Sequence, residues 1–179
     1  MFSLALGEGA ELRPLEPWHA AEFAAHADRV RRILMPWIPW ARTVVDEASA
    51  REYLQNYADR QARDEGRLYG IWVDGVLAGG VLFRVFNTAL GVCEVGVWLD
   101  EAHQGRGLVT TAVRHMIDWA VRERGMARVE WRCDPRNAPS VATAKRLGFV
   151  HEGTLRSAFV MDGERRDEQV WALLADEWS

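Results

Sequence analysis

The sequence has no long apolar run, few cysteines and no excess of basic charge. A run of roughly 18 apolar residues is needed to span a membrane, and neither such a run nor a charged-then-apolar leader occurs. The 22 Lys and Arg residues are outnumbered by 26 Asp and Glu residues, which leaves a net charge of -4. Such a chain lacks the broad positive field that attracts a nucleic-acid backbone. We therefore expect a cytoplasmic protein that binds neither membranes nor nucleic acids.

The two cysteines, Cys93 and Cys133, are too few for a disulfide framework. Both lie in apolar stretches, and neither has Cys or His neighbours at the spacing of a metal site. The sequence thus predicts two buried free thiols and no bound metal.

The length of 179 residues and a hydrophobic content of 49% suit a single domain over residues 1–179. Turn-forming residues recur along the whole chain without a repeat or a flexible linker, which is typical of an α+β sheet protein. Asp74-Gly75 and Asp162-Gly163 predict two β-hairpins, and Gly125 and Gly148 are placed to end helices. The expected order is β-α-α-β-β-β-α-β-α-β-β, with strands at residues 10–15, 67–73, 76–86, 90–99, 128–133, 149–160 and 164–173 and helices at residues 17 to about 27, 46 to about 63, 107–124 and 139–147.

A glycine-rich turn, Gln104-Gly105-Arg106-Gly107, lies between a predicted strand and a predicted helix. N–H groups at a helix start lack internal partners, and glycine lets a ligand approach the backbone without a Cβ clash. The turn is therefore suited to a pyrophosphate, although two-glycine turns also serve simply as helix caps. A dinucleotide-binding fingerprint needs a third glycine where this chain has Thr110, and the Gly-Lys-Ser/Thr ending of a Walker A motif is absent.

From residue 102 to residue 107, the chain resembles the signature Q/R-x-x-G-x-G/A of the GNAT N-acetyltransferase superfamily, with Ala102 in place of the leading Gln or Arg. The resemblance continues at Asn137, at the short helix after it and at the Leu-Gly-Phe ending of residues 147–149. It implies a mostly antiparallel sheet that is splayed at an acetyl-CoA site. It also implies that Gln104, Gly105 and Gly107 hold the pyrophosphate of acetyl-CoA as cosubstrate.

Ser140 is the candidate acid for the leaving group. In many members of the resembling family, a tyrosine seven residues after the asparagine protonates the coenzyme A thiolate, and here that residue is Ala144. Ser140 lies one helical turn before residue 144 on the same face, where its hydroxyl would reach the same sulfur. An asparagine followed by this serine resembles the branch that acetylates N-termini of ribosomal proteins, especially N-terminal serine. The alternative is that Ser140 simply caps the helix.

Glu94 is the candidate general base. It sits in an otherwise apolar predicted strand, where alternation places it on the same face as Gly96 and Trp98. Attack of an amine on a thioester requires that the ammonium lose a proton, and Glu94 would accept it directly or through water. A role as anchor of the substrate ammonium is also open. A carboxylate that is salt-bridged or exposed at a sheet edge is the alternative without a catalytic role.

The resemblance also implies further cofactor contacts. The backbone of Val97 and Leu99 would pair with the pantetheine arm at the splayed strands, and Asn137 would hydrogen-bond the cofactor. Arg106 or Lys145 would meet its phosphates.

We expect tryptophan and methionine side chains, most of them in or next to a proline-containing segment, to line the acceptor pocket. Trp37 and Trp40 are crowded around Pro36 and Pro39, which predicts a shaped loop. These tryptophans, with Met35 and Trp98, are the expected acceptor contacts, and core packing is the alternative. Farther along, residues 164–168 alternate in charge and are interpreted as a solvated hairpin edge.

The expected acceptor is the α-amine of a protein N-terminus. At pH 7 about one in six free α-amino groups is neutral, against about one in 2,500 lysine side chains. A site with one carboxylate therefore favours an α-amine. A small amine-bearing metabolite or antibiotic, a larger acyl donor and a non-catalytic acyl-CoA-binding domain remain alternatives. The resembling branch also implies a homodimer.

Overall fold

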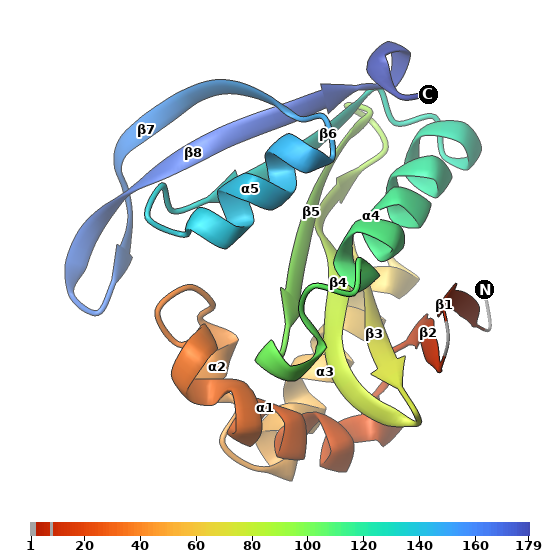
Figure 1. Ribbon diagram of the computed structural model, residues 1–179, viewed down its shortest axis with the longest axis vertical. Helices are drawn as coiled ribbons and strands as arrows, with labels where there is room; N and C mark the ends of the chain where they lie inside the picture. The colour runs from red at the N-terminus through yellow and green to blue at the C-terminus, as the bar shows by residue number, and fades with distance from the viewer. Residues whose placement is uncertain (1–2, 8) are drawn as a thin grey trace.

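The computed structural model describes residues 3–7 and 9–179 and is built around an eight-stranded sheet (Figure 1). Its strands are β1 (Leu4–Gly7), β2 (Ala10–Pro14), β3 (Arg67–Val73), β4 (Val76–Asn87), β5 (Val92–Leu99), β6 (Arg128–Cys133), β7 (Val150–Met161) and β8 (Glu164–Leu174). The strand order is β1-β2-β3-β4-β5-β6-β8-β7. All neighbours are antiparallel except β5 and β6, which confirms the predicted mostly antiparallel sheet.

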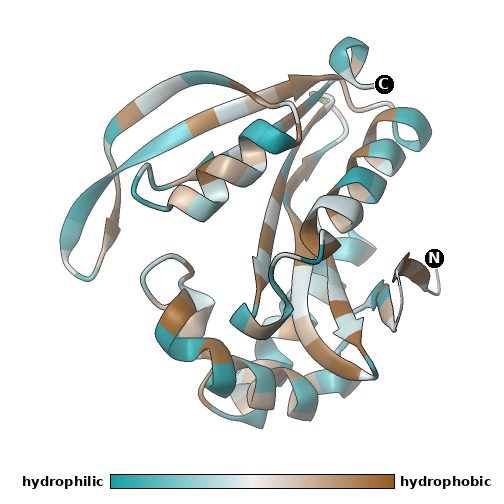
Figure 2. Cartoon of the chain, in the orientation of Figure 1, coloured by the Kyte–Doolittle hydropathy of each residue, from teal (hydrophilic) through white to brown (hydrophobic). Residues whose placement is uncertain are grey.

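Helices cover both faces of the sheet. They are α1 (Ala20–Leu34), α2 (Trp40–Thr43), α3 (Glu47–Ala62), α4 (Leu108–Asp118) and α5 (Ala138–Arg146), with 3-10 turns at Pro17–His19, Glu101–His103 and Ala175–Glu177. Helices α1 to α3 pack on one face, and α4 and α5 pack on the other. Strand alternation divides the core between the two layers, because Val81 and Phe83 point toward α4 while Leu82 points toward α1. Figure 2 shows hydrophobic central strands and helices with hydrophilic outer turns.

Both predicted hairpins are present, and their turns have the predicted chemistry. Asp74 and Gly75 have φ values of 48° and 79°, and Asp162 and Gly163 have φ values of 56° and 75°. Two successive residues with positive φ are typical of the type I′ turn, whose twist matches that of antiparallel strands.

Four elements differ from the sequence prediction. Strand β1 and helix α2 were not predicted, because each has four residues and is too short for periodicity to reveal. Helix α1 continues beyond residue 27 because Val30 and Leu34 extend its buried face at helical spacing. The long helix ends its α-helical part at Asp118 and continues as a π-helical segment, Trp119–Glu123.

The sheet opens between β5 and β6. The two strands pair in parallel over three positions, from Val92 opposite Arg128 to Glu94 opposite Glu130. Beyond Glu94, β5 continues beside β4, whereas β6 continues beside β8. The predicted splay is therefore present, and Glu94 lies at its base.

Candidate active site

A cavity of about 1180 Å³ occupies the opening between β5 and β6. Most of the side chains predicted for the site line it, although they come from four separate segments of the chain. They are Trp37, Trp40, Glu94, Val97, Trp98, Leu99, Gln104, Gly105, Gly107, Asn137 and Ser140. Met35, Arg106 and Lys145 are not among its lining residues.

One end of the cavity is bounded by the glycine turn that precedes α4. Gly105 and Gly107 have φ values of 77° and 74°, a left-handed conformation that favours glycine. Asp100 stabilises the start of the loop by accepting a 3.1 Å hydrogen bond from the His103 backbone N–H. Gly107 is the N-cap of α4, so the first N–H groups of this helix are available to an anion.

The edge of β5 forms the floor next to this turn. Val97 and Leu99 pair with Val81 and Gly79 of β4 along one edge. At these residues the opposite edge of β5 is no longer paired with β6, and it faces the cavity. An extended ligand with amide groups can add to this edge as a further strand would.

We predict that Gly107→Ala weakens acetyl-CoA binding about tenfold. A Cβ in the left-handed conformation costs roughly 1–2 kcal/mol, and here it would also project from the loop that we assign to the pyrophosphate. Gly75→Ala is the matched control, because Gly75 has a similar φ of 79° in the hairpin turn between β3 and β4. Calorimetric titration with acetyl-CoA measures both. Equal affinities in the two variants would contradict the assignment.

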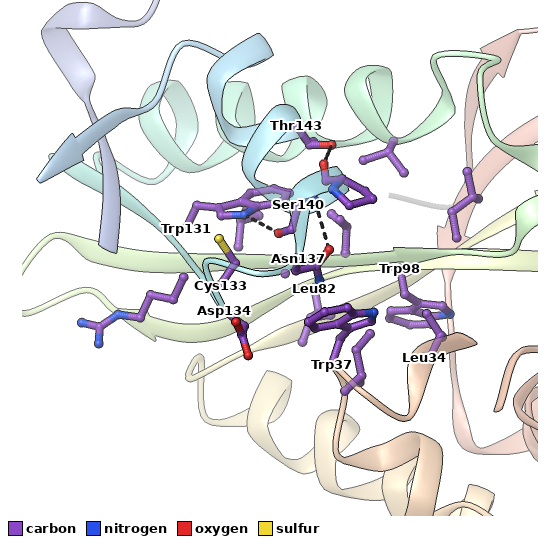
Figure 3. Close-up of a pocket in the computed structure, with 18 of the residues that line it drawn as sticks. Leu34, Trp37, Leu82, Trp98, Trp131, Cys133, Asp134, Asn137, Ser140 and Thr143 are labelled. Atoms are coloured by element: carbon purple, nitrogen blue, oxygen red, sulfur yellow. Dashed lines mark hydrogen bonds between the residues drawn. The ribbon is translucent and has the colours of Figure 1, made fainter. Parts of the chain in front are cut away.

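Ser140 and Asn137 lie together on the first turn of α5 (Figure 3). The Asn137 side-chain oxygen accepts a hydrogen bond of 3.3 Å from the Ser140 backbone N–H, so Asn137 caps the helix. The alternative that Ser140 is the cap is therefore wrong. Its hydroxyl oxygen instead accepts a 3.0 Å hydrogen bond from the Trp131 indole N–H. Ala144 is fully buried in the layer beneath α5 and does not line the cavity.

Glu94 is buried, with 7% of its surface exposed, and is held by an arginine that the sequence did not reveal. A β-bulge in β4 places Phe83 opposite Val95 and Val85 opposite Glu94, so that Arg84 is the extra residue. Both Nε and Nη2 of Arg84 lie 2.6 Å from Glu94 Oε1. Burial raises the pKa of Glu94, whereas the Arg84 cation opposes this shift. The salt-bridged alternative is thus present, and Glu94 still lines the cavity.

A second carboxylate, Glu168, also faces the cavity from β8. Its Oε2 atom lies 3.3 Å from Nη1 of Arg132, which lines the cavity as well. The prediction of a solvated edge for residues 164–168 was therefore only half right. Glu164, Arg165 and Asp167 are exposed, but alternate side chains of the same strand turn inward.

The hairpin of β7 and β8 roofs the end of the cavity that residues 36–40 line. Phe159, Val160 and Met161 of β7 line it opposite the segment 36–40. Asp162 at the hairpin tip forms a two-pronged ion pair with Arg42, with distances of 2.5 and 2.7 Å. Arg166 adds a 2.8 Å hydrogen bond to the Pro36 carbonyl oxygen. These contacts join segments more than a hundred residues apart, so the sequence could not indicate them.

The predicted tryptophans differ in burial. Trp40 and Trp98 are buried in the core beneath α1 with ring centroids 5.3 Å apart, and both also reach the cavity. These two side chains therefore pack in the core, which was the alternative, and they also contact the cavity. Trp37 is half-buried and, like Trp98, lines the cavity (Figure 3). Gly80 makes room for Trp98, because a Cβ there would lie 2.2 Å from its ring.

The three remaining predicted residues point elsewhere. Met35 lines a smaller cavity of about 500 Å³ behind the roof contact. Lys145 places its amine 5.9 Å from the ring centroid of Trp171, and the next residue, Arg146, lines the large cavity instead. Successive helical residues differ by about 100° in direction, which explains why the basic side chain on the cavity is one position later. Arg106 belongs to the glycine turn but does not line the cavity.

A buried histidine fixes the orientation of Trp98. The Trp98 indole N–H donates a hydrogen bond of 2.9 Å to Nε2 of His26, which is fully buried in α1. Burial, with help from the Arg29 cation, lowers the pKa of His26 to about 4. The imidazole is therefore neutral at pH 7 and accepts this hydrogen bond.

We predict that this histidine makes the fold sensitive to acid. Between the folded pKa of about 4 and the ordinary histidine pKa of 6.5, the unfolded chain binds the extra proton, so stability is lost as the pH falls. From pH 7 to pH 5 the loss in unfolding free energy is about 2 kcal/mol. Urea denaturation at both pH values measures it. His26→Gln keeps an acceptor for the Trp98 N–H without titrating, and an undiminished loss in this variant would exclude His26 as the cause.

In the part of the chain that the structure describes, no group of three or more His, Cys, Asp or Glu side chains could hold a metal ion. No helix in residues 3–7 and 9–179 is both long enough and apolar enough to cross a membrane. Cys93 and Cys133 are buried free thiols, as predicted, and Cys133 lines the cavity near Ser140.

Comparison with known proteins gives concordant matches. The family profile described as "Acetyltransferase (GNAT) domain" matches residues 10–150. The Probable N-acetyltransferase YjcK of Bacillus subtilis is 36% identical over 127 residues, which cover 69% of this chain and 70% of that protein. The ribosomal-protein-serine acetyltransferase of Escherichia coli is 24% identical, with 97% of both chains covered. A solved ribosomal alpha-N-protein acetyltransferase in complex with coenzyme A superposes with a TM-score of 0.90 at 23% identity, covering 98% of this chain and 99% of that one.

Proposed function

Because the chain belongs to the GNAT acetyltransferase family and transfers acetyl groups from acetyl-CoA to amines, we propose that its acceptor is the α-amine of a protein N-terminus. The observation that carries the proposal is the buried carboxylate of Glu94 on the cavity wall. One carboxylate with a raised pKa is a sufficient base for an α-amine, whose own pKa is low, but a weak one for lysine. The near full-length similarity to a ribosomal-protein-serine acetyltransferase supports the same acceptor.

The residues of the cavity fit acetyl-CoA. The left-handed glycine turn offers backbone N–H groups to the pyrophosphate, and the unpaired edge of β5 offers Val97 and Leu99 to the pantetheine arm. Arg146, rather than Lys145, is the basic side chain on the cavity wall. When bound, acetyl-CoA supplies the thioester that the amine attacks.

We assign the two proton transfers to Glu94 and Ser140. Glu94 accepts a proton from the substrate ammonium, which makes the amine nucleophilic. The roof of Phe159, Val160 and Met161 limits water at this end. Ser140 donates its hydroxyl proton to the departing sulfur as the C–S bond breaks. The attacking nitrogen then loses its second proton, which replaces the one that Ser140 gave up. The products are an amide and a free thiol.

A small amine is the second candidate acceptor, and the roof favours it. The Arg42–Asp162 ion pair closes the acceptor end over the cavity, which suits a compact substrate. A larger acyl donor remains an alternative for the other substrate. A non-catalytic acyl-CoA-binding role is disfavoured, since Glu94 and Ser140 both line the cavity.

Release of free thiol from acetyl-CoA tests the proposal. The test peptide begins with serine and contains no lysine. Its control is the same peptide with a blocked N-terminus and one internal lysine. We expect thiol release with the first peptide alone. Release with small amines but not with the peptide would reject the protein N-terminus as acceptor and retain the acetyltransferase activity.

A further inference from the structure

We propose that Trp131 is a positioning residue that directs the hydroxyl hydrogen of Ser140 toward the sulfur of the leaving coenzyme A. This inference rests on the proposed acid role of Ser140. Trp131 itself is not a proton donor in the reaction, and it acts only through the serine.

Both side chains are held rigidly on different elements. Trp131 lies on β6, is 2% exposed and packs edge-on against Phe149 with ring centroids 5.9 Å apart. Its backbone is opposite Trp171 in the pairing of β6 with β8. Ser140 is fixed in the first turn of α5 by the Asn137 cap. The 3.0 Å bond between the indole N–H and Ser140 Oγ is therefore set by two packed elements rather than by two mobile side chains.

The chemistry of the indole gives this bond a direction. An indole N–H can only donate, whereas a serine hydroxyl donates once and accepts through two lone pairs. The N–H of Trp131 occupies a lone pair of Ser140 Oγ. The hydroxyl hydrogen of Ser140 therefore cannot point toward the Trp131 indole. It is left to point toward the cavity, where Cys133 is a weak polar neighbour. A ligand sulfur in the cavity is a better acceptor once it carries negative charge.

The same bond also stabilises the step that follows. When the hydroxyl proton moves to the sulfur, negative charge develops on Ser140 Oγ, and the indole N–H already points at it. The oxygen regains its proton from the attacking amine, through water, so that no net charge remains on the serine. A hydrogen bond to a charged oxygen is stronger than one to a neutral hydroxyl, so the bond favours the transfer itself.

Steady-state kinetics of single and double variants test the proposal. The substrates are acetyl-CoA and the serine peptide, or the small amine that releases thiol if the peptide is rejected. We expect Trp131→Phe to lower kcat about fivefold to tenfold, as fits the loss of one hydrogen bond, with KM for acetyl-CoA changed less than twofold. In a Ser140→Ala background, adding Trp131→Phe should lower kcat less than twofold. Such non-additivity is the signature of two residues that act through one contact.

Trp72→Phe is the matched control. The Trp72 ring is also buried, but its indole nitrogen has no hydrogen-bond partner among the described residues. It packs in the layer with α1 to α3, and kcat should be unchanged. If Trp131→Phe fails to fold, benzothienylalanine at position 131 preserves the ring shape and lacks only the N–H.

The outcomes separate the two proposals. No effect of Trp131→Phe on kcat, or an equal effect with and without the Ser140 hydroxyl, overturns the positioning role alone. No effect of Ser140→Ala on kcat overturns the acid role and the positioning role together. A rise in KM for acetyl-CoA without a fall in kcat would mean that Trp131 only shapes the cofactor site.

Discussion

The Glu94→Gln variant is expected to turn over well over tenfold more slowly than the parent enzyme while it binds acetyl-CoA almost as tightly. Positioned bases contribute on the order of 10² or more to rates, and glutamine keeps the shape of the side chain without its basicity. Turnover is measured by thiol release, and affinity by titration with acetyl-CoA. The parent's rate should rise with pH through the pKa of Glu94, which burial raises, because only the ionised form accepts a proton. This rise should disappear in the variant.

Glu130→Gln is the matched control for this prediction. Glu130 is the direct neighbour of Glu94 across the β5–β6 pairing, it is also paired with arginines, and it does not line the cavity. Its replacement should leave turnover within a few-fold of the parent. If Glu94→Gln weakens acetyl-CoA binding as much as it slows turnover, Glu94 is part of the cofactor site and the base must be sought elsewhere. Glu168, another carboxylate on the cavity wall, would then be the next candidate.

The Ser140→Ala variant is expected to lose turnover by on the order of tenfold to a hundredfold, with KM for acetyl-CoA nearly unchanged. The loss arises because the departing thiolate must then take its proton from water rather than from a positioned hydroxyl. A small loss of stability should accompany it, since the buried indole N–H of Trp131 loses its acceptor. Initial rates at saturating amine measure the first effect, and thermal unfolding measures the second.

Thr143→Val provides the control on the same helix. Thr143 also lines the cavity, but its hydroxyl donates to the Pro139 carbonyl oxygen at 2.9 Å and is therefore directed into α5. Valine preserves the shape and removes only the hydroxyl. Equal losses in the two variants would show that any hydroxyl on this wall supports the rate, and the specific acid role of Ser140 would not stand.

The placement of the glycine turn, Asn137 and Ser140 around one cavity was largely predictable from the sequence because these parts are local. The glycine turn, the capping Asn137 and Ser140 each depend on spacing within one strand-turn-helix segment. Periodicity and turn chemistry are reliable over such distances. The exceptions were Arg106 and Lys145, because the direction of a long side chain depends on what surrounds the helix, and Arg146 faces the cavity instead.

The surroundings of Glu94 and the hairpin roof were not predictable to the same extent because they are assembled from distant segments. Arg84 reaches Glu94 only because β4 has a bulge, and a bulge is a mismatch between two strands that neither strand shows alone. The roof needs Asp162 to meet Arg42 across 120 residues of sequence. Met35 lines the smaller cavity instead, which α1 residues form together with Arg42 and with Asp162 of the hairpin tip.

The sequence by itself determined the strands, the hairpins and the glycine turn, because these follow from short-range patterns, and the family resemblance carried by that turn implied the splayed sheet and acetyl-CoA. Only the tertiary structure decided that Glu94 is buried against Arg84, that Trp131 holds the Ser140 hydroxyl, and that the β7–β8 hairpin closes over the cavity through the Arg42–Asp162 ion pair. The physical reason is that burial, ion pairing and cavity shape depend on side chains brought together by packing. No pattern along the chain encodes which distant partner each of them meets.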